Sequence, residues 1–479
     1  MTTRTVLGID VGTTNTKAVL VDPAEPGHAI AACSAPTPVD AASLVDTVVD
    51  LVRQVRGAGG PPPPAAVGIT SMAETGALLV DDVPVGPLLR WQAGSTTAFD
   101  GDPSLYAATG VPHPRKTPVA MLQALRAAGD PRLMSGRTSG RTRWAGAAEL
   151  VGHALTGRLA THPTLAARTL AYRRPAPGGA LPEAFDPDLL ALCGLRPEDF
   201  PEVLRSAEPL GRTGTPLTAL LPAGTPVVLA GHDHAVASWA VGVRAPGDVA
   251  DSLGTTEAMY ALAEGAPEVA AARLAGVSLA PDLSGKRTSV LGASATAGAV
   301  LEWFARERQV DLDALDPLAL AGLRDRASDV VHPYLRGRQC PLPDPDIRPG
   351  ALPVDDAVAL GAVARGLALQ ARWMLETVGD LAGPTAVPVV IPGPLQRCGT
   401  WQAARDGLLG TVVRSAAFPE VAAAGAALRA AALVDLAPSD ATLPVSAPGP
   451  DRSWPDAHET YTRFLATARN HQPRKQDSR

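Results

Sequence analysis

Hydrophobic residues recur along this chain of 479 residues with two different spacings. Short runs rich in β-branched residues, at positions 6–9 and 18–21, are typical of strands, and the residues between them predict a tight turn. Residues 43–55 instead carry apolar side chains three or four positions apart, which indicates an amphipathic helix. The chain is therefore expected to begin with two strands joined by a turn, followed by a helix.

The same two patterns continue along the chain and predict an α/β architecture in both halves. Further strands are expected at residues 66–70, 77–80, 226–230, 387–391 and 412–413. Further helices are expected at 144–157, 233–242, 296–307, 355–379, 400–409 and 420–434. Segments rich in proline and glycine predict loops at 59–64, 173–182 and 337–353, and the polar end predicts fraying at 470–479. We expect domains at 1–242 and 243–440, followed by a C-terminal extension at 441–479.

One short motif occurs twice, an aspartate shortly followed by Gly-Thr-Thr between apolar segments. The first copy is Asp10–Thr14 and the second is Asp251–Thr256. A glycine lets the backbone approach a ligand closely, and the N–H groups and threonine hydroxyls of such a turn can hold phosphate oxygens. Two copies in one chain favour a nucleotide triphosphate as the ligand. The alternative is that both segments are ordinary hairpins that use Gly-Thr-Thr for their turns.

Charged residues beside the first copy extend this predicted phosphate site. Asp10 closes the first strand, where it can hold Mg²⁺ directly or through water. Lys17 adds a positive charge. The expected phosphate-binding residues are Gly12, Thr13, Thr14, Lys17, Gly254, Thr255 and Thr256.

Composition excludes several classes of partner. The formal net charge of −6 gives no electrostatic reason to expect nucleic acid or an anionic membrane, so a small molecule is the expected partner. The four cysteines form no Cys-x-x-Cys pair and fit a reducing compartment better than disulfides or zinc. Asp10 interrupts the first apolar run, and no uncharged apolar run reaches about 18 residues. We therefore expect a soluble, cytoplasmic protein without a signal peptide, and the sequence leaves a homodimer open.

Several blocks, in order along the chain, resemble the FGGY carbohydrate kinases, a family within the superfamily of actin, hexokinase and Hsp70. Leu155–Gly157 followed by Thr161–Thr169 resembles the family's pattern LTG…TD.S.AS.T. Pro333–Pro341 resembles PYL.GER.P, and Trp401–Gly410 followed by Glu420–Ala427 resembles W.Q..AD.LG … E..A.GAA. The Asp-x-Gly-Thr-Thr pattern is shared by the whole superfamily, whereas the later blocks are more specific to the family.

The resemblance runs over roughly residues 4–435 and implies two RNase H-like domains of the actin-like ATPase fold with a central interdomain cleft. It implies that ATP and the substrate bind in this cleft. The γ-phosphoryl group would be transferred to a hydroxyl of a small polyol, ketose or related polyhydroxylated substrate.

The resemblance also places the general base of the reaction at Asp233. Chemistry supports this choice, because a hydroxyl that attacks the γ-phosphate needs a carboxylate to accept its proton. Asp10 and Asp233 are then the expected Mg²⁺ ligands, and a helix N-cap is the alternative role for Asp233. His232 is expected to contact the substrate or to pack. His232 and His234 also have the spacing of a metal pair, but no third ligand is evident.

The acceptor side departs from the family pattern. Glu74 matches the family's acidic contact to substrate hydroxyls, but Ala73 stands where glycerol kinases have an arginine. Most family members have Trp-Asp-x-Arg where this chain has Trp91–Gly94, so two charged groups are missing. Trp91 is expected to form an apolar wall and Gln92 to offer a neutral hydrogen-bonding group, while Ala93 and Gly94 leave space. A buried unpaired hydroxyl costs about 1–3 kcal/mol, so these changes favour a less common polyol, ketose or cyclitol. The alternative is that Glu74 and Trp91 are ordinary surface and core residues.

The adenine side departs from the pattern too. Family members have a glycine-rich loop where this chain has Ile391–Leu395. Pro392 and Pro394 lack an N–H group and remove two potential donors to the nucleotide, whereas Gly393 still allows a close approach.

Two other functions stay open beside an ATP-dependent kinase. A catalytically weak regulatory protein that binds sugar and nucleotide would explain the altered substrate and adenine segments. An Hsp70-like ATPase acting on protein is the other alternative, but the chain has no recognisable peptide-binding module after the ATPase halves. An assay of ADP release across polyols, ketoses and cyclitols separates a kinase from a sensor.

Overall fold

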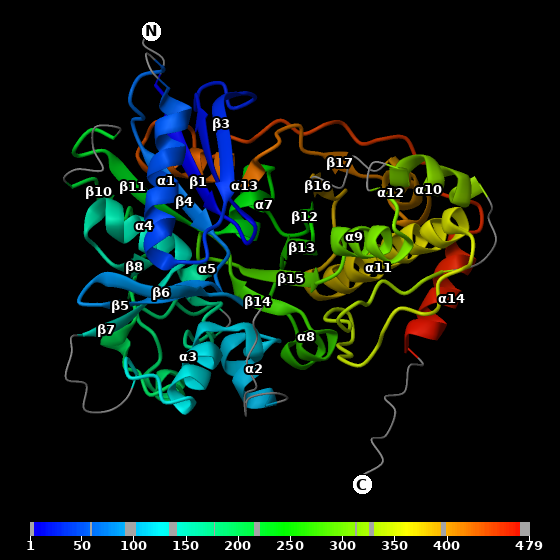
Figure 1. Ribbon diagram of the computed structural model, residues 1–479, viewed down its shortest axis with the longest axis horizontal. Coiled ribbons are helices and arrows are strands. Elements are labelled where there is room, and N and C mark those ends of the chain that lie inside the picture. Colours follow the sequence, from blue (N-terminus) through cyan, green and yellow to red (C-terminus); the bar gives the residue numbers. More distant parts are fainter. Residues whose placement is uncertain are drawn as a thin grey trace. The chain divides into compact units, whose positions relative to one another are not determined.

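The chain forms two compact units, each of which combines a mixed β-sheet with helices, as the sequence predicts (Figure 1). The computed structural model describes residues 4–57, 60–91, 102–133, 141–176, 178–214, 221–311, 314–324, 330–393 and 399–469. Unit 1 consists of Met1–Arg244, Ser278–Ser289 and Glu420–Pro444. Unit 2 consists of Ala245–Val277, Val290–Pro419 and Val445–Arg479.

The main sheet of unit 1 has the strand order β10-β11-β4-β1-β2-β3. Its strands are β1 (Val6–Val11), β2 (Asn15–Val21), β3 (Ala29–Pro36), β4 (Val67–Ser71), β10 (Gly211–Arg212) and β11 (Pro226–His232). Strands β1, β4 and β11 run parallel, whereas the pairs β1–β2, β2–β3 and β10–β11 are antiparallel. The predicted hairpin at the start of the chain is confirmed.

Helix α13 (Val421–Leu433) lies directly against the backbone of the central strands. A Cβ atom on Gly8 would fall almost on the carbonyl oxygen of Ala423, and one on Gly68 almost on that of Ala426, far closer than real Cβ atoms come to backbone. Glycines on the strands and alanines on the helix are therefore both required for this approach. Helix α7 (Asp233–Ala240) packs beside α13.

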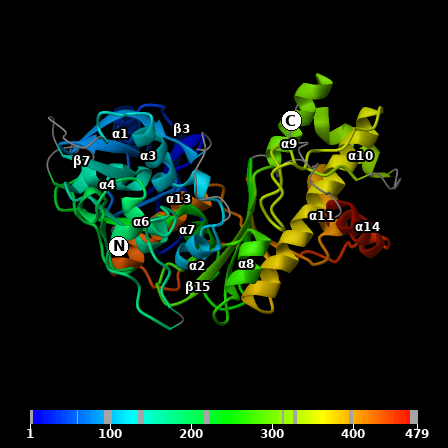
Figure 2. The same ribbon diagram turned by 90° about the horizontal axis from the view of Figure 1, so that it is seen from below.

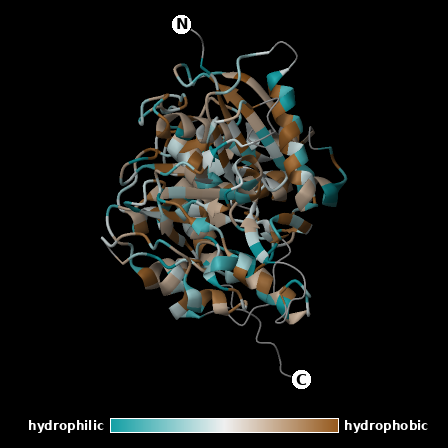
Figure 3. Ribbon diagram, turned by 90° about the vertical axis from the view of Figure 1, so that its left-hand side faces the viewer, coloured by the Kyte–Doolittle hydropathy of each residue, from teal (hydrophilic) through white to brown (hydrophobic). Residues whose placement is uncertain are grey.

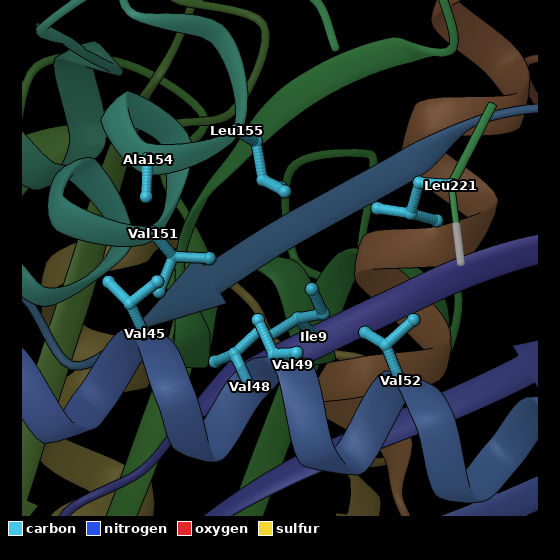
Figure 4. Close-up of a pocket in the computed structure, with 9 residues that line it drawn as sticks. All are labelled: Ile9, Val45, Val48, Val49, Val52, Val151, Ala154, Leu155 and Leu221. Carbon is cyan, nitrogen blue, oxygen red and sulfur yellow. The ribbon is translucent and has the colours of Figure 1, made fainter. Parts of the chain in front are cut away.

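Helices α1 (Ala41–Arg56) and α4 (Ala147–Thr156) cover the opposite face of the same sheet. Ile9 points toward these helices, because it follows Gly8 in β1 and successive side chains of a strand point to opposite faces. Ile9 lines a narrow cavity of about 10 Å³ between these helices (Figure 4). Valines of α1 and the side chains of Val151 and Leu155 complete its apolar wall. In Figure 3, which colours the ribbon by hydropathy, hydrophobic positions are frequent on the strands and hydrophilic positions are frequent on the outer loops.

A smaller sheet with the order β6-β5-β7 and several short helices complete unit 1. These strands and two others are β5 (Gly76–Val80), β6 (Val83–Leu89), β7 (Thr142–Gly146), β8 (Ala160–Thr161) and β9 (Glu202–Val203). The helices are α2 (Pro103–Thr109), η2 (Pro114–Lys116), α3 (Pro118–Ala127), α5 (Pro163–Ala166), α6 (Pro187–Ala191) and η3 (Pro197–Asp199). The predicted helix start at residue 144 is wrong, because Trp144 is a strand residue that pairs with Leu78 and is buried in a separate core cluster.

In unit 2 the sheet contains, in spatial order, β13 (Glu257–Leu262), β12 (Val249–Leu253), β16 (Val389–Ile391) and β17 (Arg414–Ser415). Strands β14 (Ser278–Pro281) and β15 (Thr288–Ser294) follow β13 along the chain. The helices are α8 (Val269–Ala275), α9 (Gly298–Arg308), α10 (Leu315–Arg324), α11 (Asp356–Ala382), α12 (Gly399–Leu408) and α14 (Ala457–Arg469). Figure 2 shows α14 beside the long helix α11.

One strand of unit 2 differs from its predicted position. The sequence predicts a strand at residues 412–413, but β17 occupies Arg414 and Ser415, because pairing with β16 starts where Val389 meets Arg414. None of the helices in the described part of the chain combines the length and hydropathy that a bilayer crossing needs.

Candidate active site

The parallel strands of unit 1 bring three predicted site residues to one edge of the sheet. Val11 at the end of β1 is in register with Ser71 at the end of β4, which is in register with His232 at the end of β11. Asp10, Glu74 and Asp233 therefore gather at the carboxyl ends of these strands, where open α/β sheets usually bind ligands. The negative charge of Asp233 acts on the carboxyl groups of both Asp10 and Glu74.

The first turn, Gly12–Thr14, is fixed by Thr37. The Thr37 hydroxyl donates to the carbonyl oxygen of Gly12 at 2.7 Å, and its backbone N–H donates to that of Thr14 at 2.9 Å. The Gly12 N–H donates to the carbonyl oxygen of Asn15 at 3.1 Å, which closes the turn. The side chain of Thr14 is exposed and that of Thr13 is half-buried. The turn is thus held rigidly at the edge where the three carboxylates gather.

Asp10 is a buried carboxylate with an unused acceptor. Among the described residues, no donor forms a hydrogen bond with its Oδ1 atom. Burial raises the pKa of Asp10 to about 7; Lys17 opposes this shift, while Asp233 and Glu420 add to it. Lys17 also forms an ion pair with Glu420, with 2.6 Å between Nζ and Oε2. A positive group bound beside Asp10 would offset the negative charge of these carboxylates.

Asp233 is the first residue of α7, and His232 is the N-cap residue. The Asp233 Oδ1 atom accepts a hydrogen bond from the His234 N–H at 2.6 Å and lies 3.2 Å from Nε2 of His232. Burial alone raises the pKa of Asp233, but His234, His232 and the His234 N–H together lower it below its ordinary value. The carboxylate is therefore ionised at neutral pH and can accept a proton, which a cap-only role does not require.

The histidines beside Asp233 do not form a metal site within the described residues, where no group of three metal-ligating side chains occurs. The rings of His232 and His234 lie in an edge-to-face arrangement, with centroids 5.4 Å apart. Burial lowers the pKa of His232 to about 4, so this imidazole is neutral at neutral pH and can donate or accept a hydrogen bond.

Glu74 is held by an arginine that the sequence analysis did not identify as a site residue. Arg168 places Nε 2.7 Å and Nη2 2.6 Å from Oε1 of Glu74, and its Nη1 donates to the hydroxyl of Ser278. Burial raises the pKa of Glu74, but Arg168 and His232 together lower it below its ordinary value, so the carboxylate stays ionised. Glu74 is thus neither an exposed surface residue nor an apolar core residue.

Trp91 lies beside the first turn. Its indole Nε1 donates to the Thr13 hydroxyl at 3.1 Å, and the Thr13 hydroxyl donates to the sulfur of Met72. The ammonium group of Lys116 lies 4.8 Å from the centre of the Trp91 ring. One face of the ring is therefore covered by a cation. Gln92, the other expected residue of this segment, lies outside the described residues.

The second turn, Gly254–Thr256, belongs to unit 2 and is anchored to the start of α9. The N–H groups of Gly298 and Ala299 donate to the carbonyl oxygens of Gly254 and Thr255, both at 3.1 Å. A Cβ atom on Gly393 would collide with the backbone at Leu253 and Gly254, so only glycine fits beside the turn. Gly393 thus lies against the second turn, whereas its predicted close approach to a nucleotide stays a prediction; its neighbour Pro394 lies outside the described residues.

Two site residues of unit 1 were missed, Arg168 and Glu420. Both lie inside blocks that carry the family resemblance, at Thr161–Thr169 and Glu420–Ala427. Their ion pairs connect residues far apart in the chain, so no local spacing in the sequence indicates them.

The mixed sheets of the two units are those of the actin-like ATPase fold, whose members include kinases that transfer a phosphoryl group from ATP to an alcohol. Residues 5–240 match the N-terminal domain of the FGGY family of carbohydrate kinases. The chain belongs to this family, as its sequence motifs predict.

Two named relatives and one solved structure illustrate the range of similarity. A glycerol kinase from Methylobacterium nodulans is 29% identical over 385 residues, which cover 73% of this chain and 72% of the relative. A xylulose kinase from Streptomyces rubiginosus is 29% identical over 261 residues, which cover 53% of this chain and 50% of the relative. The ligand-bound xylulose kinase from Lactobacillus acidophilus has the same fold, with a TM-score of 0.81 at 18% identity over 97% of this chain and 98% of that one.

Proposed function

We propose that this carbohydrate kinase uses MgATP to phosphorylate a hydroxyl of a small polyol, ketose or related polyhydroxylated substrate. The proposal rests on one observation above all. Three carboxylates gather at one edge of the sheet in unit 1, and their surroundings give Asp10 a raised pKa but Asp233 a lowered one. Two carboxyl groups at one edge whose pKa values are shifted in opposite directions are suited to different tasks.

Asp233 is the proposed general base. Its ionised carboxylate accepts the proton of the attacking hydroxyl, while the His234 N–H and the imidazole of His232 hold it in place. His232, being neutral, is also free to hydrogen-bond the acceptor. The backbone and hydroxyls of Gly12–Thr14, together with Lys17, are the proposed phosphate ligands in unit 1. In unit 2 the proposed nucleotide contacts are Gly254, Thr255, Thr256 and Gly393.

The residues present fit a divalent cation at Asp10. Its Oδ1 atom has no hydrogen-bond donor among the described residues, and the negative charges of Asp233 and Glu420 raise the pKa of Asp10. Mg²⁺ favours one or two carboxylates together with phosphate oxygens and water, which matches Asp10 and Asp233. When bound, it would neutralise charge on the phosphoryl oxygens.

Replacing Asp10 by asparagine should remove the stabilisation that Mg²⁺ adds to nucleotide binding. The amide keeps the shape of the side chain but cannot neutralise a cation. We expect Mg²⁺ to raise the Tm of the wild-type protein in the presence of ADP, because a ligand that binds only the folded state stabilises it. In D10N the melting curves with and without Mg²⁺ should coincide. Asp22→Asn, which changes a half-buried carboxylate just after β2, serves as the control, and an unchanged Mg²⁺ effect in D10N would remove Asp10 from the cation site.

Glu74, Trp91, Gln92 and His232 are the proposed acceptor residues. Glu74 offers an ionised carboxylate to substrate hydroxyls, and Arg168 holds it from the side. Arg168 therefore supplies a positive charge next to Glu74, although Ala73 lacks the arginine of glycerol kinases. The arginine beside Glu74 thus comes from position 168 and not from position 73. This difference favours an acceptor other than the usual substrates of the family.

Replacing Arg168 by methionine should raise the KM for the acceptor and leave the KM for ATP near its wild-type value. Methionine keeps the length of the stem but leaves Glu74 without its charged partner; hydrogen bonds to charged groups are worth about 1.5–3 kcal/mol, so we expect a change of about 10-fold or more. Arg173→Met, which breaks the more exposed pair with Asp186, is the matched control. Steady-state kinetics with each substrate varied in turn measures the effect, and equal changes in both KM values would contradict it.

A screen of ADP release with polyols, ketoses, aldonates and cyclitols tests the function itself. We expect one class of acceptor to give turnover that depends on both ATP and Mg²⁺. Calorimetry should be run in parallel on every compound. An acceptor that binds without any ADP release would favour the regulatory alternative, which the altered segment at Ala73 and the proline at position 392 motivate.

A further inference from the structure

A buried charge network lies beneath the second turn of unit 2. Arg405 of α12 donates from Nη1 to Oε1 of Glu257 on β13 at 2.5 Å and from Nη2 to Oδ2 of Asp251 on β12. The three side chains are almost completely buried, with exposed fractions of 6%, 1% and 2%. Burying charges is costly, so such a network needs an explanation.

Asp251 is not the counterpart of Asp10, although both precede a Gly-Thr-Thr turn. Asp10 is the second-last residue of β1, whereas Asp251 is the third-last residue of β12. Side chains alternate between the two faces of a strand, so this shift of one residue turns Asp251 to the opposite face from the one that Asp10 would occupy. The position that matches Asp10 is Ser252. The second aspartate therefore serves Arg405 rather than a phosphate-bound cation.

The network holds two carboxyl groups and one guanidinium. Burial raises the pKa of both Asp251 and Glu257, and Arg405 opposes the shift in each. When the carboxyl groups of Asp251 and Glu257 are both ionised, Oδ1 of Asp251 accepts no hydrogen bond from the described residues. A proton on Glu257 would supply that donor and leave the network with no net charge. We therefore treat Asp251 and Glu257 as a pair that shares one proton at neutral pH.

The network connects three parts of the predicted nucleotide site. Asp251 and Glu257 lie on the two strands that flank the second turn, and Glu257 directly follows Thr256. Arg405 comes from the helix after Gly393, whose backbone lies against Leu253 and Gly254. One guanidinium thus joins both strands of the hairpin to the helix of the adenine-side segment.

We propose that Arg405 is a positioning residue for the nucleotide: together with Asp251 and Glu257 it fixes the second turn against α12 in the geometry that binds phosphate. This role rests on the proposed function of Gly254–Thr256 as a phosphate-binding turn. Arg405 touches neither phosphate nor acceptor and acts only through the hairpin. Its loss should weaken nucleotide binding and leave the acceptor site of unit 1 unchanged.

Calorimetric titration with ADP in the presence of Mg²⁺ tests the proposal without an identified acceptor. Arg405→Met should bind ADP about 10-fold more weakly than the wild-type protein, within the about 2- to 30-fold range of coupling through packed networks. Arg372→Met is the matched control, since Arg372 is also a largely buried arginine of unit 2, paired with Glu376 on α11. Equal ADP affinity in the two variants would overturn the proposal.

Glu257→Gln keeps the test decisive if Arg405→Met fails to fold. Glutamine mimics the protonated acid, because its oxygen accepts from Arg405 and its amide donates to Asp251. E257Q should therefore bind ADP as the wild type does at pH 7. The charges that act on Glu257 come from Asp251 on β12 and Arg405 on α12. The wild-type protein should lose ADP affinity as the pH rises above neutral and the shared proton leaves, whereas E257Q should not.

Two outcomes separate this inference from the proposed kinase function. If E257Q loses ADP affinity at alkaline pH in parallel with the wild type, the network does not position the turn, and phosphotransfer is unaffected by that conclusion. If no acceptor gives ADP release but Arg405→Met still weakens ADP binding relative to Arg372→Met, the network stands and the kinase proposal fails.

Discussion

Replacing Asp233 by alanine is expected to lower kcat by about 10²–10⁴-fold, the range for removal of a general base. The carboxylate is ionised at neutral pH, because His234, His232 and the His234 N–H lower its pKa despite burial. Without it the attacking hydroxyl loses the proposed acceptor of its proton. The change is best measured as acceptor-dependent ADP release under saturating ATP.

The control for Asp233→Ala is nucleotide binding. ADP affinity should remain close to the wild-type value, because Gly12–Thr14 and the second turn are untouched. Asp22→Ala, which removes a half-buried carboxylate of the same unit, should keep the full kcat. Turnover near the wild-type rate in Asp233→Ala would remove this residue from the mechanism, and loss of ADP binding would show that it acts mainly as a Mg²⁺ ligand rather than as the base.

Replacing Gly68 by alanine should have the largest effect on stability. The new Cβ atom would overlap the carbonyl group of Ala426 in α13, and backbone atoms cannot turn aside as a flexible side chain can. Helix α13 would have to move away from β4, which also disturbs its contact with Gly8. Overpacking a core commonly costs about 1–3 kcal/mol, and we expect roughly 3 kcal/mol or more here.

Urea unfolding followed by circular dichroism measures the loss of stability in Gly68→Ala. Gly214→Ala is the control, because no atom lies within 4 Å of its added Cβ and the residue is exposed. If the two variants unfold at the same urea concentration, α13 does not pack on β4 as described.

The local elements of this fold are readable from the sequence because their signals are local. The hairpin β1–β2 and the helix α1 follow from runs and spacings of a few residues, and their limits agree with the predictions to within about three residues. The prediction of a helix at Trp144 was wrong because this residue is held in a strand by pairing with Leu78 of β5, and the local pattern does not show this pairing. Similarly, nothing near Gly68 in the sequence shows that a helix more than 350 residues later, α13, will press against it.

In the candidate site, too, local signals can be read from the sequence, whereas long-range contacts cannot. Family motifs and strand ends direct attention to Asp10 and Asp233, and the parallel register explains why such residues gather at one edge. The ion pairs that adjust them are not readable, since Arg168 and Glu74 lie 94 residues apart. Likewise, the repeated Asp and Gly-Thr-Thr motif suggests two equivalent aspartates, whereas a shift of one residue gives Asp251 a different role. The assigned roles themselves remain predictions for the experiments above.

The segment Glu420–Pro444 belongs to unit 1, although most of unit 2 precedes it in the chain. During translation, the sheet that starts at Val6 must therefore wait for Leu433 to leave the ribosome before its second face can be covered. Until then the glycine-lined face of the nascent sheet stays open to chaperones and to aggregation. A recombinant fragment that stops near Arg244 would lack α13, so this face of its sheet would stay uncovered permanently.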